Sequence, residues 1–377
     1  MNNRKYNSHR LMIMLSGLIP SFISLFLNRN SLRVTLNSEF NTEFNHNTKT
    51  LFFFLINNYP EFEVKFVIAD KKKRELLLHQ YGDHFIGNSR FSDIYYILTS
   101  KYWFTSSLET PVGGVFHSFR RKVFHLGHGS PIKAIGLLEG YSNWLKKAYY
   151  RMVRTNFSFF ISSSDLFDIA WSNFIGVGKE KVVRAGQPRN DNLTIKDEMN
   201  SSKKILYAPT WRPFSDTLLF PFIDFSPNDL SSFLSERALE LHLRLHPNFE
   251  SKLPDNIARL DNITILTKEK IDDINVVLNQ YDILITDYSS IYVDYLLLDK
   301  PIVFIPYDFE EYRSKIGFSI DYCTLSPGPK PTTFKSLLRE IDQYIKNENY
   351  YREERSIVNG LLNPIKSGHC QSVVDIM

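Results

Sequence analysis

Short apolar runs alternate with amphipathic stretches from residue 31 onward, and this alternation predicts parallel strands with helices packed on both faces of a sheet. The first strands are expected over residues 32–36, 64–68, 102–105, 122–126, 157–161 and 182–184. A helix is expected over 48–58 with Asn47 as its cap, and another is expected to open with the charged run at Asp70.

A second series of five apolar strands follows Lys204, over residues 205–208, 242–245, 263–266, 283–286 and 302–305. Helices fit between and after these strands, over 274–280, 290–298 and 335–349. The polar stretch 191–202 lacks aromatic residues and is the expected linker. We therefore predict an α/β fold of two Rossmann-like domains, over 31–190 and 203–350, with parallel sheets facing a central cleft. Residues 351–377 are expected to form a C-terminal tail.

The N-terminal region contains an apolar segment, residues 11–27, with basic residues on both flanks. The flanking cations are Arg4, Lys5, Arg10, Arg29 and Arg33. Seventeen residues is close to the shortest helix that crosses ~30 Å of hydrocarbon, and no small-x-small cleavage site follows the segment. Residues 1–30 are therefore expected to lie on a membrane surface with their cations near anionic lipid. A true span and a buried helix or signal peptide are the alternatives.

The composition is that of a folded protein, with 43% hydrophobic, 14% aromatic and 23% charged residues. The length of 377 residues exceeds the roughly 250–300 that one core serves, which agrees with two domains. The net charge of +4 is weaker than a dedicated nucleic-acid binder usually carries, so no nucleic-acid partner is expected. A small anionic substrate or an anionic membrane fits better. The two cysteines, Cys323 and Cys370, are far apart in sequence and exclude a disulfide framework.

The first candidate site is the segment HLGHGSPIKAIG, residues 125–136, which follows an expected strand. Glycines on both sides of His128 break regular structure, so its imidazole can be presented into a cleft and accept a proton from a hydroxyl. Lys133 could hold a phosphate oxygen. His125 lies on the strand itself and is expected to be packed, and a turn-capping role is the alternative for His128.

Two further strand ends carry polar groups. His246, in ELHLRLHPNF, could donate to a phosphate or a leaving group, and a structural histidine is the alternative. In DILITDYSSIYVDYLLLDKPIVFIPYD, a buried strand ends at Asp287, and Ser289 and Ser290 open a helix. Free N–H groups and the positive end of a helix dipole suit such a turn to phosphate, although a serine cap explains one of the two hydroxyls. Asp287, Ser289 and Ser290 are candidate substrate-binding groups.

Arginines beside prolines form the fourth candidate: Arg189 in GQPRND and Arg212 in YAPTWRP. A planar guanidinium can grip phosphate through two parallel hydrogen bonds, although surface arginines are common. The sequence contains no GxGxxG, GxxxxGK[ST] or GxSxG motif, and no His, Asp and Glu cluster has metal-ligand spacing. No metal and no cofactor is therefore expected.

Together these segments resemble the motifs of the CDP-glycerol glycerophosphotransferase family, which includes teichoic acid and capsule primases and polymerases. The family forms HGTPLK, GYPRND, LYAPTWR, LRLHP and TDYSSxxFDYLLLxKP correspond, in the same order, to HGSPIK, GQPRND, LYAPTWR, LRLHP and TDYSSIYVDYLLLDKP. The resemblance covers roughly residues 36–340, and the last motif is highly specific.

The resemblance implies a GT-B-like unit, with an acceptor-side N-terminal domain and a CDP-polyol-binding C-terminal domain, peripheral at the cytoplasmic face of the cell membrane. It also implies transfer of glycerol phosphate from CDP-glycerol to a hydroxyl of a lipid-linked or polymer acceptor, with release of CMP. His128 and His246 match the family's essential histidines, and Ser289 and Ser290 match the serines that hold the pyrophosphate. Weaker matches are Thr210, Arg212 and Asp294.

The expected mechanism is an in-line attack at a phosphoryl group. His128 would take the proton from the acceptor hydroxyl, and the pyrophosphate would rest on the helix that begins at Ser289. His246 and Arg212 would add cations or donors at the leaving CMP.

Several departures leave the donor and the acceptor open. Many family members have tryptophan where this chain has Gly127, and Ser130, Ile132 and Gln187 replace threonine, leucine and tyrosine. Relatives also use CDP-ribitol, so a ribitol-phosphate transferase is one alternative. A nucleotide-sugar glycosyltransferase of the same architecture, an inactive membrane-bound scaffold of envelope assembly and a nucleic-acid binder are the others.

Overall fold

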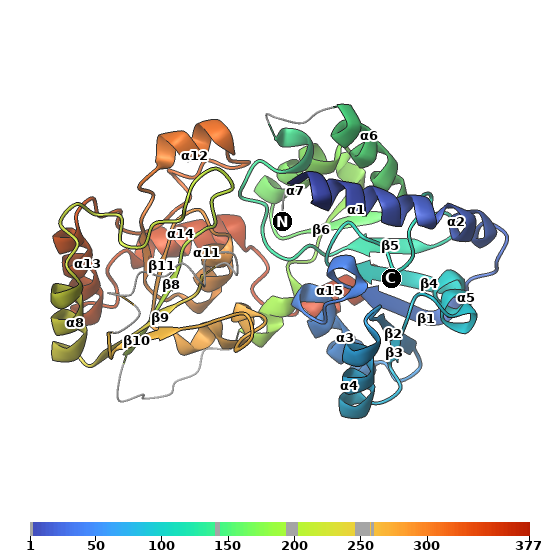
Figure 1. Ribbon diagram of the computed structural model, residues 1–377, viewed down its shortest axis with the longest axis horizontal. Coiled ribbons are helices and arrows are strands. Elements are labelled where there is room, and N and C mark those ends of the chain that lie inside the picture. Colours follow the sequence, from blue (N-terminus) through green and yellow to red (C-terminus); the bar gives the residue numbers. More distant parts are fainter. Residues whose placement is uncertain (1–2, 140–143, 194–202, 246–256, 258–259) are drawn as a thin grey trace. The chain divides into compact units, whose positions relative to one another are not determined.

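The computed structural model divides into two compact units, residues Met1–Asp191 with Ile365–Met377 and residues Asn192–Pro364. It describes residues 3–139, 144–193, 203–245, 257 and 260–377 (Figure 1). The chain enters the second unit at the start of the expected linker and returns to the first unit at residue 365. The segment expected as a tail is therefore divided, because α14 (Arg352–Leu362) belongs to the second unit and α15 (His369–Val374) to the first.

A seven-stranded parallel sheet forms the centre of the first unit, in the order β3-β2-β1-β4-β5-β6-β7. Its strands are β1 (Asn30–Asn37), β2 (Glu63–Val67), β3 (Phe85–Ile86), β4 (Ser100–Thr105), β5 (Lys122–His125), β6 (Phe159–Ser162) and β7 (Val182–Arg184). The six predicted strands are present, whereas β3 is too short to show a periodicity. The chain order reverses between β1 and β4, which makes this pair the topological switch point of the sheet.

The two helices predicted in the first unit begin close to the predicted residues, as α3 (His46–Asn58) and α4 (Lys71–Tyr81). The unit also contains α5 (Phe91–Thr99), α6 (Trp144–Val153) and α7 (Asp165–Ile175), which were not predicted. Asp70 caps α4, since its carboxylate accepts the backbone N–H of Lys73 at 2.7 Å. The predicted cap of α3 is wrong: the helix starts one residue before Asn47, whose side chain instead bonds to other loops.

Aromatic side chains fix α3 against the sheet. The ring of Phe44 meets those of Phe52, Phe66 and Phe85 edge to face, with centroids 5.5, 4.9 and 5.2 Å apart. All four side chains are buried, and edge-to-face pairs of this kind add to the free energy of burial. The polar residues at the start of α3 are thereby held at the carboxyl edge of β1.

The segment after residue 365 completes the first unit. Asp191 accepts the backbone N–H groups of His369 and Cys370 at 2.8 and 2.7 Å, and Cys370 and Val373 are fully buried in the first unit's core. Gly186 permits this docking, because it has a φ of +72° and a Cβ there would lie 2.0 Å from Nδ1 of His369.

We expect Gly186→Ala to lower the free energy of unfolding by about 1–3 kcal/mol, through left-handed strain and the clash with His369. Urea unfolding followed by circular dichroism measures this loss. Gly82→Ala is the matched control, because Gly82 has a φ of +81° with nothing within 4 Å of a Cβ. Equal losses in the two variants would show that the contact with His369 carries no energy.

The apolar N-terminal segment forms two short helices, α1 (Asn3–Ser16) and α2 (Leu18–Ser24), joined at Gly17. A Cβ on Gly17 would come within 1.8 Å of the carbonyl carbon of Gly113, so the two backbones lie in direct contact. Ser21 Oγ accepts the backbone N–H of Val115 at 3.0 Å. One side of the helix pair thus packs against the loop that follows β4 and is hydrogen-bonded to it.

The other side of α1 and α2 is apolar and exposed. Its exposed residues are Leu11, Met12, Leu15, Leu18, Ile19, Phe22, Ile23 and Phe26, here called the N-terminal apolar stripe. Arg10 pairs with Glu109 at 2.5 Å and anchors α1 close to this stripe. Within the described ranges, no helix has both the length and the apolar character that crossing a membrane requires.

The second unit contains a five-stranded parallel sheet in the order β10-β9-β8-β11-β12. The strands are β8 (Lys203–Ala208), β9 (Leu239–Leu243), β10 (Ile263–Ile265), β11 (Ile283–Thr286) and β12 (Ile302–Phe304). All five were predicted. The order reverses between β8 and β11, so this sheet has a switch point of its own.

The helices of the second unit include several short turns. Among the described residues they include α8 (Pro227–Glu236), the 3₁₀ turns η6 (Ile274–Gln280) and η7 (Leu296–Leu298), α11 (Ile291–Tyr295), α12 (Phe309–Lys315), α13 (Phe334–Lys346) and α14. The helix predicted over 274–280 is a 3₁₀ turn, and the one predicted over 290–298 changes to 3₁₀ geometry at Leu296. A capping box between Thr333 and Ser336 starts α13.

Candidate active site

The candidate residues gather at the switch points of the two sheets, each unit holding its own group. In the first unit the loop after β5 brings His128 to Ser106, which directly follows β4. In the second unit Thr210, after β8, meets Asp287, after β11. Ligands of open α/β sheets bind at such positions.

His128 is the polar centre of the first group. Its Nδ1 lies 3.0 Å from the backbone carbonyl oxygen of Ser106, so Nδ1 carries the proton and Nε2 is left as the acceptor. The ring lies beside that of His46, with centroids 5.4 Å apart. Water reaches His128, but the protein packed around the ring disfavours the imidazolium and lowers the pKa of His128. Repulsion from His46 lowers this pKa further, and attraction to Glu39 opposes the shift.

Asn47 holds the loop of His128 in place. Its fully buried amide donates to the carbonyl oxygens of Leu126 and Gly127 at 3.0 and 2.9 Å, and its Oδ1 accepts the backbone N–H of Arg189 at 3.1 Å. Asn47 therefore joins α3 to both the HGSPIK and the GQPRND segments.

Arg189 is buried, and its guanidinium donates to the carbonyl oxygen of His128 at 2.7 Å. This contact stabilises the loop that presents the imidazole. Gln187 similarly donates to the buried Ser130 hydroxyl at 3.1 Å, and Lys133 is half-buried in the same loop.

His125 is packed, as the sequence predicts. Its ring lies 5.0 Å from Trp171 and within 5.6 Å of Phe157 and Phe160, and burial lowers its pKa to about 3. A histidine with this pKa stays neutral over the physiological pH range, and His125 is part of the hydrophobic packing.

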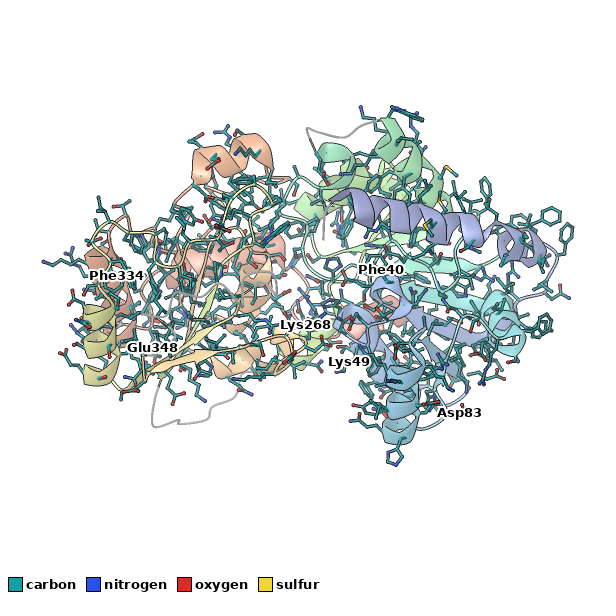
Figure 2. All side chains as sticks on the ribbon, viewed as in Figure 1. Phe40, Lys49, Asp83, Lys268, Phe334 and Glu348 are labelled. Atoms are coloured by element: carbon teal, nitrogen blue, oxygen red, sulfur yellow. The ribbon has the colours of Figure 1, made fainter. Side chains whose placement is uncertain are left out.

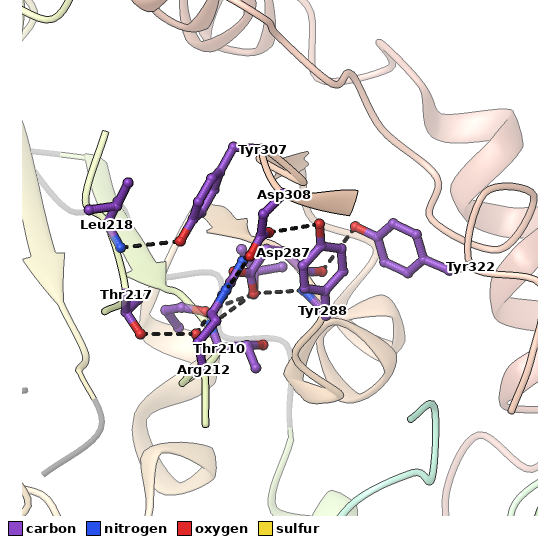
Figure 3. Close-up of polar contacts among 11 residues, drawn as sticks. Thr210, Arg212, Thr217, Leu218, Asp287, Tyr288, Tyr307, Asp308 and Tyr322 are labelled. Atoms are coloured by element: carbon purple, nitrogen blue, oxygen red, sulfur yellow. Dashed lines mark hydrogen bonds and ion pairs between the residues drawn. The ribbon is translucent and has the colours of Figure 1, made fainter. Parts of the chain in front are cut away.

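The second group is built on Arg212, whose side chain is fully buried. Figure 3 shows its polar contacts with the neighbouring residues. Its Nε and Nη2 donate to the two oxygens of Asp308 at 2.9 and 2.8 Å, and its Nη1 donates to Asp287. The rings of Tyr288 and Tyr307 lie 5.0 and 4.8 Å from the guanidinium carbon. Burial alone lowers the pKa of Arg212, but the pairs with Asp308 and Asp287 outweigh it and raise the pKa.

The Arg212 side chain, expected to contact phosphate, is bonded within its own unit in the structure. The guanidinium is bound to two carboxylates of its own unit rather than presented at the surface. Asp287 is buried too, and its Oδ1 accepts the backbone N–H groups of Thr210 and Tyr288 at 2.8 and 2.6 Å. Arg212, Asp287 and Asp308 thus form a network behind the turn that leads to Ser289.

Ser289 and Ser290 lie half-buried at the start of α11, directly after this network. The Ser289 hydroxyl accepts the backbone N–H of Ile291 at 3.4 Å. Asp294 is fully buried within α11, where it accepts an N–H of Asn275 at 3.3 Å, so it lies in the interior. His246 lies outside the described residues.

Sequence reasoning did not identify His46, Glu39 or Asp308. His46 directly precedes the predicted cap Asn47, and nothing in its local pattern shows that it meets a residue 82 positions later. Asp308 follows β12 in the run IPYD, so its place after an apolar strand was an available signal. Among the described residues, no group of three or more His, Cys, Asp and Glu could hold a metal ion.

The arrangement supplies one histidine with a free acceptor nitrogen in the first unit and a rigid serine turn in the second. The first can accept a proton from a hydroxyl, and the second can donate hydrogen bonds to an anionic oxygen. Transfer of a charged group to a hydroxyl uses both properties.

Comparison with known proteins agrees with this assignment. The family model described as CDP-Glycerol:Poly(glycerophosphate) glycerophosphotransferase matches residues 19–376. A teichoic acid glycerol-phosphate transferase of Staphylococcus aureus is 25% identical over 84% of both chains, and a teichoic acid poly(glycerol phosphate) polymerase of Bacillus spizizenii is 27% identical over 93% of this chain and 91% of its own. A ribitol-phosphate polymerase of S. aureus, TarK, is 28% identical over 49% of this chain and 38% of its own.

The solved structure of the wall teichoic acid polymerase TagF has the same fold. It matches with a TM-score of 0.74 and 17% sequence identity, over 98% of this chain and 97% of that chain. At this identity the similarity establishes the α/β architecture with parallel sheets.

Proposed function

Because the chain belongs to the CDP-glycerol:poly(glycerophosphate) glycerophosphotransferase family, we propose that it transfers glycerol phosphate from CDP-glycerol to a hydroxyl of a lipid-linked or polymer acceptor. The acceptor oxygen forms a bond to the phosphorus of glycerol phosphate, the bond to CMP breaks, and CMP leaves. The observation that carries this proposal is the position of His128, at the switch point with Nε2 open as an acceptor.

His128 is assigned the role of general base. Its Nδ1–H is held by Ser106, so Nε2 takes the proton of the attacking hydroxyl as the new bond to phosphorus forms. The lowered pKa of His128 supports this role, because the imidazole then stays neutral at physiological pH. Asn47 and Arg189 act as positioning residues, since they bond the loop but not the reacting atoms.

The second unit is assigned to the donor. Ser289 and Ser290 would donate to the pyrophosphate oxygens of CDP-glycerol, and the Arg212 network would hold their turn rigid. His246 of the LRLHP motif would stabilise the departing CMP, and Lys133 would border the phosphate on the acceptor side. The assignment includes the GT-B-like architecture of two Rossmann-like units that the sequence motifs imply.

Release of CMP by the purified protein tests the proposal. CDP-glycerol, CDP-ribitol and UDP-sugars are supplied separately, each with a crude lipid-linked acceptor. Release from CDP-glycerol, lost in His128→Ala, is the expected result. Release of CMP from CDP-ribitol alone would identify ribitol phosphate as the transferred group. Release of a nucleotide from a UDP-sugar alone would show that the protein is a glycosyltransferase.

The proposal includes peripheral attachment to the cytoplasmic face of the cell membrane through residues 1–30. The N-terminal apolar stripe supports it, because Met12 and Ile19 are 66% and 73% exposed while the opposite side of the helices is fastened to the first unit. An exposed apolar face with nearby cations is typical of helices that lie in a membrane interface.

We expect the double variant Ile19→Glu and Phe22→Glu to reduce binding to anionic vesicles by at least ~10-fold, since two apolar side chains leave the bilayer. Vesicle flotation measures the bound fraction. Leu76→Glu is the control, because Leu76 is 71% exposed on α4, outside the stripe. Flotation of the double variant at the level of the unaltered protein would place the membrane contact elsewhere.

A further inference from the structure

A pocket of about 400 Å³ lies in the second unit, between residues 324–330, here called the edge segment, and helix α14. Pro327 and Lys330 line it from the edge segment, and Glu354, Ile357 and Val358 line it from the helix. Its volume is within the range of about 300–1,000 Å³ that small-molecule sites occupy. None of the residues that line it belongs to the candidate active site.

The edge segment is fixed along the outer strand of the second sheet. The backbone N–H of Phe304, in β12, donates to the carbonyl oxygen of Pro329 at 3.0 Å. A Cβ on Gly328 would lie 2.2 Å from the carbonyl oxygen of Ile302, so the two backbones are in direct contact. This wall of the pocket is therefore part of the fold itself.

The start of α14 is fixed as well. Arg355 is buried and donates to the carbonyl oxygens of Tyr350 at 2.7 Å and of Glu348, labelled in Figure 2, at 3.3 Å. Its Nε lies 3.7 Å from the carboxylate of Asp299. Glu354 directly precedes this arginine, so its side chain extends from an anchored turn of the helix.

Lys330 brings a cation to the pocket. Its Nζ donates to the carbonyl oxygens of Ser326 and Gly328 at 2.8 and 3.5 Å and lies 5.5 Å from the centroid of the Phe304 ring. These contacts hold the ammonium group close to the backbone of the edge segment. Because an ammonium group has three N–H donors, one of them remains for an anionic oxygen.

Glu354 adds the opposite charge from the other wall. Its side chain is exposed, and no ion pair joins it to Lys330 in the part of the chain that the structure describes. Apolar side chains line the same pocket, since Pro327 and Val358 are buried and Ile357 is 58% exposed. The pocket therefore presents a cation, an anion and an apolar surface to one small ligand.

We propose that this pocket binds a small zwitterion with an apolar body, namely an α-amino acid with an aliphatic side chain. The carboxylate of the ligand accepts the remaining N–H of Lys330, and its ammonium group donates to Glu354. Its side chain packs against Pro327, Ile357 and Val358. A ligand with a single charge would leave either Lys330 or Glu354 without a partner from the ligand. The site is separate from the proposed transfer reaction and does not depend on it.

The edge segment is also bonded to the turn that carries Ser289. The Ser326 hydroxyl donates to the carbonyl oxygen of Tyr322 at 2.7 Å, and the Tyr322 hydroxyl donates to the backbone carbonyl oxygen of Asp287 at 3.1 Å. A ligand that holds the edge segment therefore also restrains Tyr322. Amide hydrogen exchange over residues 322–330 consequently reports whether the pocket is occupied.

Calorimetric titration of the full-length protein tests the proposal. The probes are leucine, leucinamide, which lacks the carboxylate, and 4-methylpentanoate, which lacks the ammonium group. Leucine should bind about 10-fold more tightly than either of the others, because only leucine pairs with both charges. Bound leucine should also slow amide hydrogen exchange over residues 322–330.

Glu354→Gln and Lys330→Gln should each weaken leucine binding by about 10-fold. Glu353→Gln is the matched control, because Glu353 is an exposed neighbour on α14 that does not line the pocket. The change at Glu354 should leave the affinity for 4-methylpentanoate unaltered, which separates the loss of one charge from a collapsed pocket.

Three results would overturn the proposal: no binding of leucine, equal affinity for the three probes, or unchanged affinity for leucine in Glu354→Gln. Binding of leucine without slower hydrogen exchange over residues 322–330 would place the site elsewhere and overturn it as well. Failure of the proposed function would appear separately, as absence of CMP release by the unaltered protein.

Discussion

Replacing His128 by alanine is expected to lower turnover of CDP-glycerol by at least ~100-fold, the scale of a lost general base. The acceptor hydroxyl then has no group to take its proton while the bond to phosphorus forms. CMP release under saturating donor and acceptor measures the loss. His79→Ala is the control, because His79 is an exposed histidine in the last turn of α4.

Near-normal turnover in His128→Ala, with an unchanged circular dichroism spectrum, would remove His128 from the role of base. The pH dependence gives a second check on the same residue. Since the pKa of His128 is lowered, kcat/KM should fall only below the ordinary imidazole value of about 6.5. His46→Gln should move this acidic limb to higher pH, because it removes a repulsive neighbour.

Replacing Arg212 by methionine is expected to lower the free energy of unfolding by about 3–5 kcal/mol. The substitution leaves the carboxylates of Asp287 and Asp308 buried without their shared cation. Urea unfolding measures the loss. Arg352→Met, in the same unit, breaks a largely exposed pair with Asp299 and should cost no more than about 1 kcal/mol.

The same variant separates two roles for Arg212. If Arg212 belongs to a buried network, the Arg212→Met protein should lose both stability and CMP release, because the turn at Ser289 relaxes. A direct phosphate contact predicts loss of CMP release with stability unchanged. Full stability in Arg212→Met would therefore overturn the network and restore the role expected from the sequence.

The strands of both sheets could be predicted because each is an apolar run bounded by polar or turn residues. Helix type could not be predicted for the segments 274–280 and 296–298, which are 3₁₀ turns, because an apolar pattern over so few residues does not distinguish 3₁₀ from α geometry. The return of residues 365–377 to the first unit has no local signal. It depends on Asp191 and Gly186, which the whole second unit separates from it in the sequence.

The candidate site shows the same division. His128, Ser289 and Ser290 could be proposed from the sequence because they follow apolar strands, where α/β folds place their ligands. The contacts of His128 with His46 and Ser106 could not be predicted from the sequence, because they join three separate loops at one edge of the sheet. For Arg212 the motif gave the position but not the direction of the side chain, which tertiary contacts decide.

The return of the chain after residue 365 also has a consequence for biosynthesis. Cys370 and Val373 fill the core of the first unit, yet the ribosome adds them only after the whole second unit. The first unit therefore cannot complete its core until the last residues of the chain have been synthesised, whereas the second unit can fold before then. We expect the first unit to be the later one to reach its native state, and a chaperone that shields apolar surface to act on it during that interval.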